Sequence, residues 1–331
     1  MTITVTPSHI EVAAATLSSG GLVAFPTETV YGLGADARNS SAVRRIFEVK
    51  GRPSNNPLIV HVASLDAIAQ YADLSRSANP TRVQERLAKL STLWPGPLSV
   101  VLPAAPTIAR EVCAGGDTVA LRIPNHPIAL ALLKAFNGPV AAPSANPSNY
   151  ISPTTAQHVK QGLGDAVDCI LDGGPCAIGL ESTVLSLLEP TPRILRPGAV
   201  TKEHLEQTLG CNVISAAPPG TPTLGTPLQS PGLMEKHYSP TTPVVLLTSV
   251  DSSTKLPARV GAILFAPRAL PFTPLYTTVL SDSGDLASVA VKLFAALRDL
   301  DSKKLDLIVV DTCEPLGLGE AIMDRLVRAA R

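Results

Sequence analysis

Groups of polar residues with reactive or anion-binding side chains stand at the ends of apolar runs in the first 200 residues. They occupy residues 26–34, 50–53, 118–122, 143–146, 181–183 and 196–198, with Asn56 and His61 close to the second group. Ligands of open α/β sheets bind where strand ends meet loops. We therefore expect these groups to converge on one binding site.

The basic residues in these groups are suited to anions. Arg122 stands within the apolar run Val-Ala-Leu-Arg-Ile-Pro, where a buried charge is costly unless an anion meets it. Lys50, Arg52 and Arg196 could bind phosphates, the arginines as planar forks and the lysine as a point charge. Other interpretations stay open, because Arg122 could pair with a carboxylate and Lys50 and Arg52 could stabilise the C-terminal end of a helix.

Several polar residues also suit structural roles. His61 falls in an alternating strand pattern, which is typical of a half-buried, hydrogen-bonded histidine. Ser144 and Asn146 could form turns beside prolines, and Ser152 before Pro153 is a good N-cap for the next helix. Each therefore keeps two interpretations, one structural and one functional.

Familiar cofactor motifs are weak or missing. Residues 32–37, GLGADA, fit the dinucleotide pattern GxGxxA, but the preceding strand ends at Pro26, and five residues intervene. A nicotinamide-dependent oxidoreductase rests on this motif alone. The sequence contains no Walker loop, HExxH or GxSxG motif, and its five cysteines form no CxxC pair, so no metal site is expected.

The composition disfavours nucleic acid and membrane partners. Lys+Arg and Asp+Glu are both 27, so the formal net charge is zero, and charged residues make up 16% against about 25% in an average soluble protein. A broad electrostatic footprint for DNA or acidic membranes is therefore not expected. No apolar run approaches the roughly 18 residues of a membrane span, and the first residues lack the pattern of a secretory signal. The sequence thus predicts a cytoplasmic protein.

Alternating strand and helix patterns must position the polar groups. Apolar runs predict strands at residues 22–25, 58–62, 98–102, 118–123, 140–142, 170–171, 183–188 and 193–195, and later at 244–247, 260–265 and 305–310. Helical spacing is found at residues 41–49, 81–90, 127–136, 154–161, 202–209, 286–300 and 319–330. A capping box of Ser8 and Glu11 predicts a first helix ending at Gly20. The irregular alternation favours a mixed sheet.

Proline marks the predicted domain boundaries. The chain has 31 prolines in 331 residues, nearly twice the usual share, and seven of them lie within residues 216–243. We predict an α/β domain over residues 1–212, a proline-rich linker over 213–243 and a small α/β domain over 244–331. The linker also contains Lys236, His237 and Tyr238, three side chains of types that often take part in binding or catalysis.

In this order, the motifs resemble those of the threonylcarbamoyl-AMP synthases, in the long form with an added C-terminal domain. The matching segments are PTETVYGLG at 26–34, KGRP and NPL at 50–58, WPGPLS at 94–99, LRIP at 121–124, APSAN at 142–146, STV at 182–184, LRPG at 195–198 and SPGLMEKHYSP at 230–240. The resemblance covers roughly residues 8–331. It implies a YrdC-like mixed-sheet α/β domain, followed by a proline-rich linker and a small Rossmann-like α/β domain.

The resemblance implies an enzyme that makes threonylcarbamoyl-AMP and pyrophosphate from L-threonine, bicarbonate and ATP, with Mg²⁺ accompanying ATP. The product would pass to a downstream threonylcarbamoyl-transferase machinery that modifies tRNA beside the anticodon. Aligning two anions and spreading the charge of the departing pyrophosphate is the main task, which Lys and Arg can perform without a nucleophilic side chain. A non-catalytic RNA-binding module of the same fold is the alternative, and weak RNA contact is compatible with either function.

The resemblance also implies roles for individual residues. By motif position, the threonine pocket consists of Thr29, His61, Arg122, Ala142 and Ser182, and the ATP-binding set is Arg52, Asn56, Thr118, Ser144, Ser152, Arg196 and Tyr238. Lys50 and Arg52 are the catalytic candidates, with Lys50 as a phosphate contact. Two positions depart from the family pattern. Met234 and Glu235 replace a basic residue and a tyrosine, and Ser99 replaces a threonine.

Overall fold

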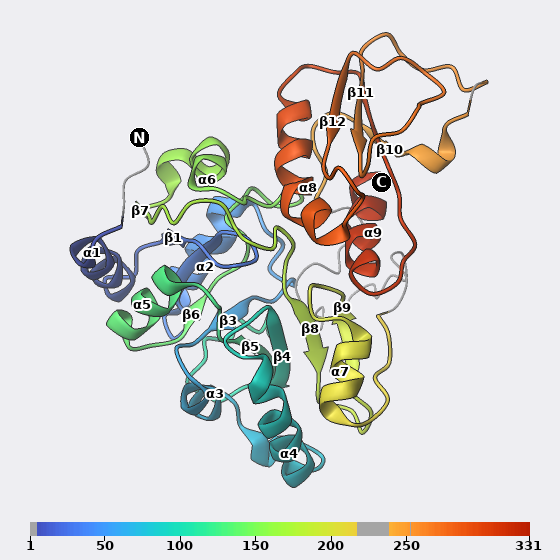
Figure 1. Cartoon of the computed structure of the whole chain (residues 1–331). Helices are drawn as coiled ribbons and strands as arrows, with labels where there is room; N and C mark the ends of the chain where they lie inside the picture. The colour runs from blue at the N-terminus through green and yellow to red at the C-terminus, as the bar shows by residue number, and fades with distance from the viewer. Residues whose placement is uncertain (1–4, 217–237, 252) are drawn as a thin grey trace.

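Two β-sheets organise the chain in the computed structural model, which describes residues 5–216, 238–251 and 253–331 (Figure 1). The larger sheet comes from the first 200 residues, and the smaller one from residues after 243. Helices accompany both sheets, and the larger sheet mixes parallel and antiparallel strands. The predicted mixed-sheet α/β class is therefore confirmed.

The larger sheet has the strand order β7-β1-β2-β6-β3-β5-β4-β8-β9 within the described residues. Its strands are β1 (Val23–Phe25), β2 (Gly32–Asp36), β3 (Ile59–His61), β4 (Leu98–Pro103), β5 (Thr118–Arg122), β6 (Val140–Ala141), β7 (Cys169–Ile170), β8 (Thr183–Ser186) and β9 (Arg193–Arg196). Strands β3 and β5 are parallel neighbours, as are β4 and β8. The last residues of β3 and β5 therefore lie side by side.

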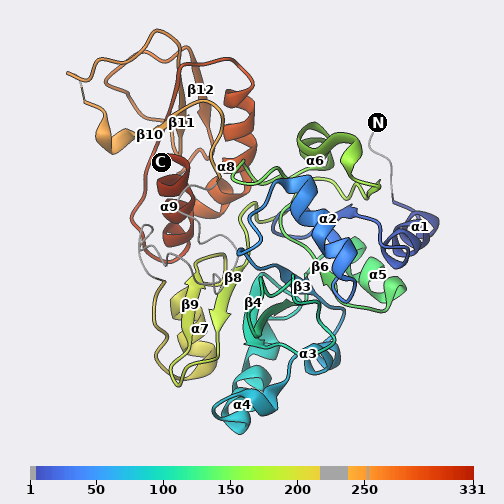
Figure 2. The same cartoon turned by 180° about the vertical axis from the view of Figure 1, so that it is seen from behind.

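The smaller sheet is parallel throughout its described strands. Its order is β10-β13-β11-β12, with β10 (Val244–Leu246), β11 (Val260–Leu264), β12 (Tyr276–Val279) and β13 (Leu307–Val310). Helices α8 (Leu286–Asp301) and α9 (Leu318–Ala329) pack with it, and Figure 2 shows both from behind. Val30, Ile151 and Leu180 of the larger part join one apolar cluster with Leu293 and Phe294 of α8, so the two parts share buried surface.

Helices surround the larger sheet. They are α1 (Pro7–Ser18), α2 (Ser40–Lys50), α3 (Leu65–Tyr71), α4 (Pro80–Leu90), α5 (Pro127–Phe136), α6 (Ala156–Leu163) and α7 (Lys202–Leu209), and short 3-10 turns occupy Leu74–Arg76, Ser91–Leu93, Gly164–Ala166 and Leu247–Ser249. Helix α2 leads directly into the site. Its N-cap Asn39 accepts hydrogen bonds from two backbone N–H groups, and Gly51 ends it with a φ of 59°. Lys50 and Arg52 are thereby held on either side of this glycine.

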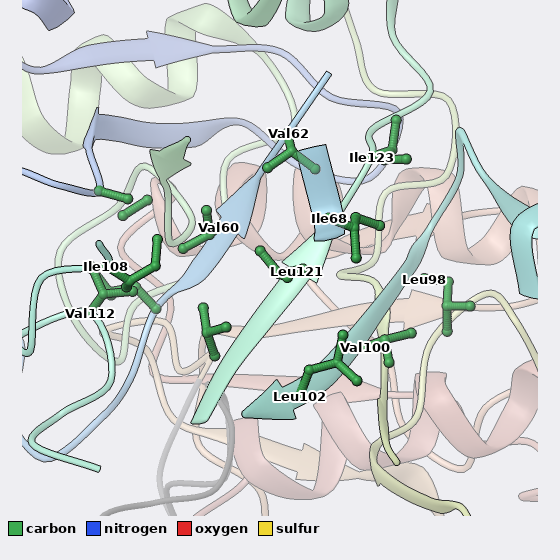
Figure 3. Packing of buried hydrophobic residues seen from close by; sticks show 14 of the residues in the cluster. Val60, Val62, Ile68, Leu98, Val100, Leu102, Ile108, Val112, Leu121 and Ile123 are labelled. Atoms are coloured by element: carbon green, nitrogen blue, oxygen red, sulfur yellow. The ribbon is translucent and has the colours of Figure 1, made fainter. Parts of the chain in front are cut away.

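Side chains alternate between the two faces of the central strands. Val60, Val100 and Leu121 point into the main apolar cluster, where the labelled side chains of Figure 3 gather. Their neighbours Ile59, His61 and Arg122 face the other way and line a pocket. One face of the sheet thus builds the core, and the other builds a candidate site.

The first helix starts differently from the prediction. Thr6, not Ser8, is the N-cap of α1, and the capping box joins Thr6 to His9. Pro7 explains the shift, because proline has no backbone N–H and its fixed φ suits the first position of a helix.

The GLGADA motif is a strand, not a nucleotide-binding loop. Its residues Gly32–Asp36 form β2, which pairs antiparallel with β1. A Cβ atom on Gly34 would lie 2.7 Å from Cγ1 of Val140 and 2.8 Å from the Phe25 ring. Close packing between neighbouring strands therefore requires this glycine, and the dinucleotide interpretation loses its structural basis.

Elements α3 and β12 have no counterpart in the predictions, and both are short. Helices α8 and α9, which the apolar spacing predicted, are confirmed with small shifts at their ends. Residues 217–237 of the predicted linker lie outside the described residues, and with them Met234, Glu235, Lys236 and His237. Within the described ranges, no helix has the length and apolar character needed to cross a membrane.

Candidate functional site

A pocket on one face of the larger sheet brings together most of the predicted site residues. Those that line it are Thr29, Arg52, His61, Arg122, Ala142, Ser144, Ser182, Arg196 and Tyr238. Residues without a predicted role also line it, namely Thr27, Val30, Gly32, Ile59, Pro143 and Glu181. Lys50, Asn56, Thr118 and Ser152 are not part of the lining.

Strand pairing explains why residues far apart in the sequence meet here. His61 and Arg122 end the parallel strands β3 and β5 and are partners in the register. Arg196 ends β9 and pairs with Val184, and Ser182 directly precedes β8. Since β8 lies beside β4, and β4 beside β5, the serine and both arginines come to one region.

Arg122 is 3% exposed, and all three nitrogen atoms of its guanidinium group make contacts. Its Nε donates to the Gly96 carbonyl at 3.2 Å, and its Nη1 donates to Oγ1 of Thr29 at 3.0 Å. Its Nη2 lies 2.7 Å from Oε1 of Glu28, so the carboxylate partner that the sequence left open is present. These contacts do not use all five donors of a guanidinium, which leaves Arg122 able to bind a further carboxylate in the pocket.

Arg52 is fixed by the loop that follows α2. Its Nη2 donates to Oδ1 of Asn56 at 2.6 Å and to the Pro57 carbonyl at 2.8 Å, and its Nε donates to the Asn56 carbonyl at 3.0 Å. Asn56 is fully buried and does not line the pocket. Its side chain therefore orients Arg52 toward whatever the pocket holds.

Arg196 and Ser182 form a second fixed unit. The arginine donates from Nε and Nη2 to the Ser182 carbonyl, at 3.2 and 2.9 Å. The Ser182 hydroxyl lies 2.9 Å from the Ser99 hydroxyl. The serine at position 99, which departs from the family pattern, thus keeps a hydroxyl in contact with the pocket wall.

The guanidinium groups of the pocket repel one another. Burial, together with repulsion from Arg196, lowers the pKa of Arg52 to about 9. Burial also lowers the pKa of Arg196, with Arg325 and Arg122 adding to the effect. An anion bound between these guanidinium groups would relieve the repulsion. Perturbed cations in a pocket are typical of a functional site.

His61 is held as a neutral side chain. It is 3% exposed, and the edge of its ring meets Phe25 with 5.8 Å between ring centroids. Burial and the neighbouring Arg122 charge lower its pKa to about 3. A neutral imidazole can both donate and accept hydrogen bonds, which suits recognition of a small polar substrate.

Lys50 lies behind the pocket wall. Its Nζ donates to the carbonyls of Ser144, at 2.6 Å, and Asn146, and the side chain is buried. Burial and the charge of Arg52 lower its pKa well below the ordinary value. In this structure Lys50 orients the loop that carries Ser144, and its role as a phosphate contact stays a prediction.

Ser152 does not cap the following helix as predicted. The N-cap of α6 is Thr155, whose side chain accepts from the His158 N–H. The buried Ser152 hydroxyl donates instead to Oε1 of Glu181, a residue of the pocket lining. Glu181 stands in one of the polar groups noted in the sequence, although no role was predicted for it.

Thr118 does not line the pocket, whereas Tyr238 does. Thr118 begins β5 on the same face as Arg122, about 13 Å away at the usual rise per residue. Tyr238 is fully buried in the pocket wall and stacks on Phe294 of α8, with 5.6 Å between ring centroids. Burial raises its pKa to about 12, so the phenol stays protonated.

Chemically, this arrangement suits two anionic ligands or one ligand with several anionic groups. Arg122, Arg52 and Arg196 provide fixed guanidinium donors, and Thr29, His61 and Ser182 add neutral polar groups. The described part of the chain contains no group of three or more His, Cys, Asp or Glu side chains that could hold a metal ion.

Two family models match the chain. Residues 15–198 match the Sua5_yciO_yrdC family, described as "Telomere recombination", and residues 200–331 match the "Threonylcarbamoyl-AMP synthase, C-terminal domain" family. Together they span nearly the whole sequence.

Curated relatives and solved structures agree with these models. The threonylcarbamoyl-AMP synthase of Bacillus subtilis is 41% identical over 97% of this chain and 93% of its own length, and that of Pyrococcus abyssi is 39% identical over 97% and 94%. A crystal structure of P. abyssi Sua5 complexed with L-threonine superposes with a TM-score of 0.87 at 36% identity, covering 99% of this chain and 96% of that one. Escherichia coli YciO, 24% identical with a TM-score of 0.51 over 59% of this chain and 91% of its own, shares the fold.

Proposed function

The chain belongs to the threonylcarbamoyl-AMP synthase family in its long form, and we propose that it makes threonylcarbamoyl-AMP and pyrophosphate from L-threonine, bicarbonate and ATP. It is thus an enzyme, and we assign it to the nucleotidyltransferases because an AMP group would pass from ATP to a carbamate. Residues 1–212 would form the catalytic domain, 213–243 the linker and 244–331 an accessory domain.

The observation that carries this proposal is the set of buried guanidinium groups around one pocket. Arg122, Arg52 and Arg196 are each less than 10% exposed and face the same space. In our assignment, Arg122 binds the threonine carboxylate, while Thr29, His61 and Ser182 surround the rest of the amino acid. Arg52 and Arg196 bind phosphate oxygens of ATP, with charge-assisted hydrogen bonds on a fixed fork.

The reaction needs alignment more than it needs a nucleophilic side chain. Threonine's amine and bicarbonate first give a carbamate and water. A carbamate oxygen then attacks the α-phosphorus of ATP, the bond between the α- and β-phosphates breaks, and pyrophosphate leaves. Holding both anions in line lowers the entropic cost of their encounter, and the arginines stabilise the charge that develops on the leaving group.

Mg²⁺ would enter as part of the ATP complex. A magnesium ion in such sites keeps several waters and binds substrate phosphates with one or two carboxylates at most. Glu181, the carboxylate of the pocket lining, already accepts hydrogen bonds from Ser152 and Arg325. The residues present therefore fit a metal held mainly by the triphosphate, which would neutralise part of its charge.

The product is a mixed anhydride of a carbamic acid and AMP, which hydrolyses readily in water. We therefore propose that it is consumed quickly by a partner that transfers the threonylcarbamoyl group to tRNA. Neither the formal net charge of zero nor the pocket described above points to tight RNA binding by the chain itself.

Pyrophosphate release is the direct test of the proposed function. The full chain should release pyrophosphate from ATP only when threonine and bicarbonate are both present, because the attacking carbamate does not exist until both have reacted. Omitting either one, in carbonate-depleted buffer, should reduce release to background. Full-rate release without added threonine or bicarbonate would contradict the mechanism, and release of phosphate instead would indicate an unrelated ATPase.

A further inference from the structure

A buried arginine of the C-terminal helix reaches the wall of the pocket. Arg325 on α9 is 1% exposed. Its Nε donates to Oε2 of Glu181 at 3.0 Å, and its Nη1 donates to the Pro197 carbonyl at 2.8 Å. Glu181 lies just before β8, and Pro197 just after β9. Helix α9 therefore meets the larger part of the chain beside these two strands (Figure 2).

The same arginine contacts the aromatic residue of the pocket wall. The Arg325 guanidinium lies 5.4 Å from the centroid of the Tyr238 ring. The ring also stacks on Phe294 at an interplanar angle of 21°. Tyr238 is thus held by α8 and α9 together, while it lines the pocket. Arg325 therefore touches two lining residues, Glu181 and Tyr238, without lining the pocket itself.

Charge explains what Arg325 does for Glu181. A carboxylate in the lining of a pocket that binds a triphosphate would repel the ligand. The ion pair with Arg325 compensates that charge, and the Ser152 hydroxyl holds the second carboxylate oxygen. With Arg325 absent, Glu181 would face the pocket as a less compensated anion.

Arg325 is itself held in place on α9. Oδ2 of Asp324 accepts a hydrogen bond from its Nη1 at 2.9 Å, and Oδ1 of Asp324 accepts one from Arg328 at the same distance. Burial acts to lower the pKa of Arg325, but Tyr238 and the Glu181 and Asp324 carboxylates outweigh it and raise the pKa above the ordinary value. The guanidinium therefore stays charged and fixed in orientation.

We propose that Arg325 is a positioning residue of the nucleotide site, which neutralises Glu181 and fixes the Tyr238 ring so that the pocket accepts ATP. The inference rests on the proposed function, because it assigns the pocket to ATP and threonine. It gives the C-terminal part of the chain a defined task in the reaction, namely to complete the wall on the nucleotide side.

The test compares Arg325→Ala and Arg325→Lys with the intact protein in titrations with threonine and with a non-hydrolysable ATP analogue. Arg325→Ala should weaken analogue binding roughly 10-fold or more, because the uncompensated Glu181 carboxylate then repels the triphosphate, and change threonine affinity less than threefold. Lysine keeps the charge without the fork, so Arg325→Lys should recover part of the loss. Arg259→Ala is the matched control, since Arg259 donates to the Lys303 and Lys304 carbonyls within the C-terminal part.

A second substitution separates positioning from folding. If the damage in Arg325→Ala comes from the exposed charge of Glu181, then adding Glu181→Gln should restore part of the analogue affinity. If Arg325 acted only on folding, Arg325→Ala would weaken threonine and analogue binding alike, and Glu181→Gln would restore both together. Equal losses of threonine and analogue binding, or an Arg325→Ala protein with wild-type analogue affinity, would overturn the proposal. Wild-type protein that binds the analogue but releases no pyrophosphate would overturn the proposed function instead, and the titrations would still decide the role of Arg325.

Discussion

The pocket and helix α9 both bury arginines, but they compensate the charge in different ways. On α9, Asp324 accepts hydrogen bonds from both Arg325 and Arg328, and Glu181 adds a second carboxylate for Arg325. In the pocket, Arg52 donates to carbonyl and amide oxygens, and no carboxylate in the described residues forms an ion pair with it. The pKa of Arg325 is accordingly raised, and that of Arg52 is lowered.

The different partners of these arginines indicate different roles for the α9 charges and for the charge of Arg52. A buried cation that carboxylates already compensate needs no ligand of its own, and it holds neighbouring groups in place, as Arg325 holds Glu181 and Tyr238. A buried cation with neutral partners destabilises the empty protein, and it gains most when an anion arrives. Loss of Asp324, the shared carboxylate on α9, should therefore act mainly on stability, and loss of Arg52 should act mainly on ligand binding.

The largest effect on stability is expected on α9. Asp324→Ala should lower the free energy of unfolding by about 3–5 kcal/mol, because it removes a buried partner from two guanidinium groups. Urea unfolding of the full chain measures the change. Asp299→Ala is the control, since its ion pair with Lys303 at 3.2 Å is exposed and worth only about 0–1 kcal/mol. Similar small losses in both variants would show that the charges on α9 are not structural.

Arg122 and Arg52 should act on different ligands. Arg122→Ala should weaken threonine binding, and Arg52→Ala should weaken binding of an ATP analogue, each by about 1.5–3 kcal/mol or roughly 10- to 150-fold. The melting temperature of the empty Arg52→Ala protein should change little, because relief of the buried charge offsets the loss of its hydrogen bonds to Asn56 and Pro57. Calorimetric titrations with both ligands measure the effects, with Arg45→Ala as an exposed control. An Arg122→Ala protein that keeps its threonine affinity would show that the two ligands are assigned to the wrong arginines.

Residues of the pocket could be predicted because their signal is local. A charge within an apolar strand, as at Arg122, is unusual enough to demand a partner. Polar groups at successive strand ends, such as those with His61 and Ser182, converge in any open α/β sheet. The register of β3 and β5 brings His61 to Arg122, as this argument expects.

Contacts that depend on distant parts of the chain could not be predicted. The pair of Glu181 and Arg325 joins residues 144 positions apart, and no local pattern specifies it. The sequence did contain one indication that Arg325 has a buried partner. Arg325 lies among Ile322, Leu326 and Ala329 on the apolar face of α9, where a charged side chain is unusual. Likewise, the need for a glycine at position 34 comes from Val140 on a neighbouring strand, which made a packing requirement resemble a dinucleotide motif.

The smallest of these effects concerns the pH dependence of stability through His61. Its pKa is about 3 in the folded protein against about 6.5 unfolded, so between these values only the unfolded chain binds the proton. Stability from this residue is therefore complete above pH 6.5 and is lost as the pH falls. Lowering the pH from 7.5 to 5.5 should remove about 1.4 kcal/mol of the free energy of unfolding through His61.

Urea unfolding at both pH values should show a smaller decrease in the free energy of unfolding for His61→Gln than for the intact protein. His126 and His158, whose pKa values are also lowered by burial, remain in both proteins, so the difference between the two reports on position 61. Identical decreases would mean that burial and the Arg122 charge do not hold this imidazole neutral.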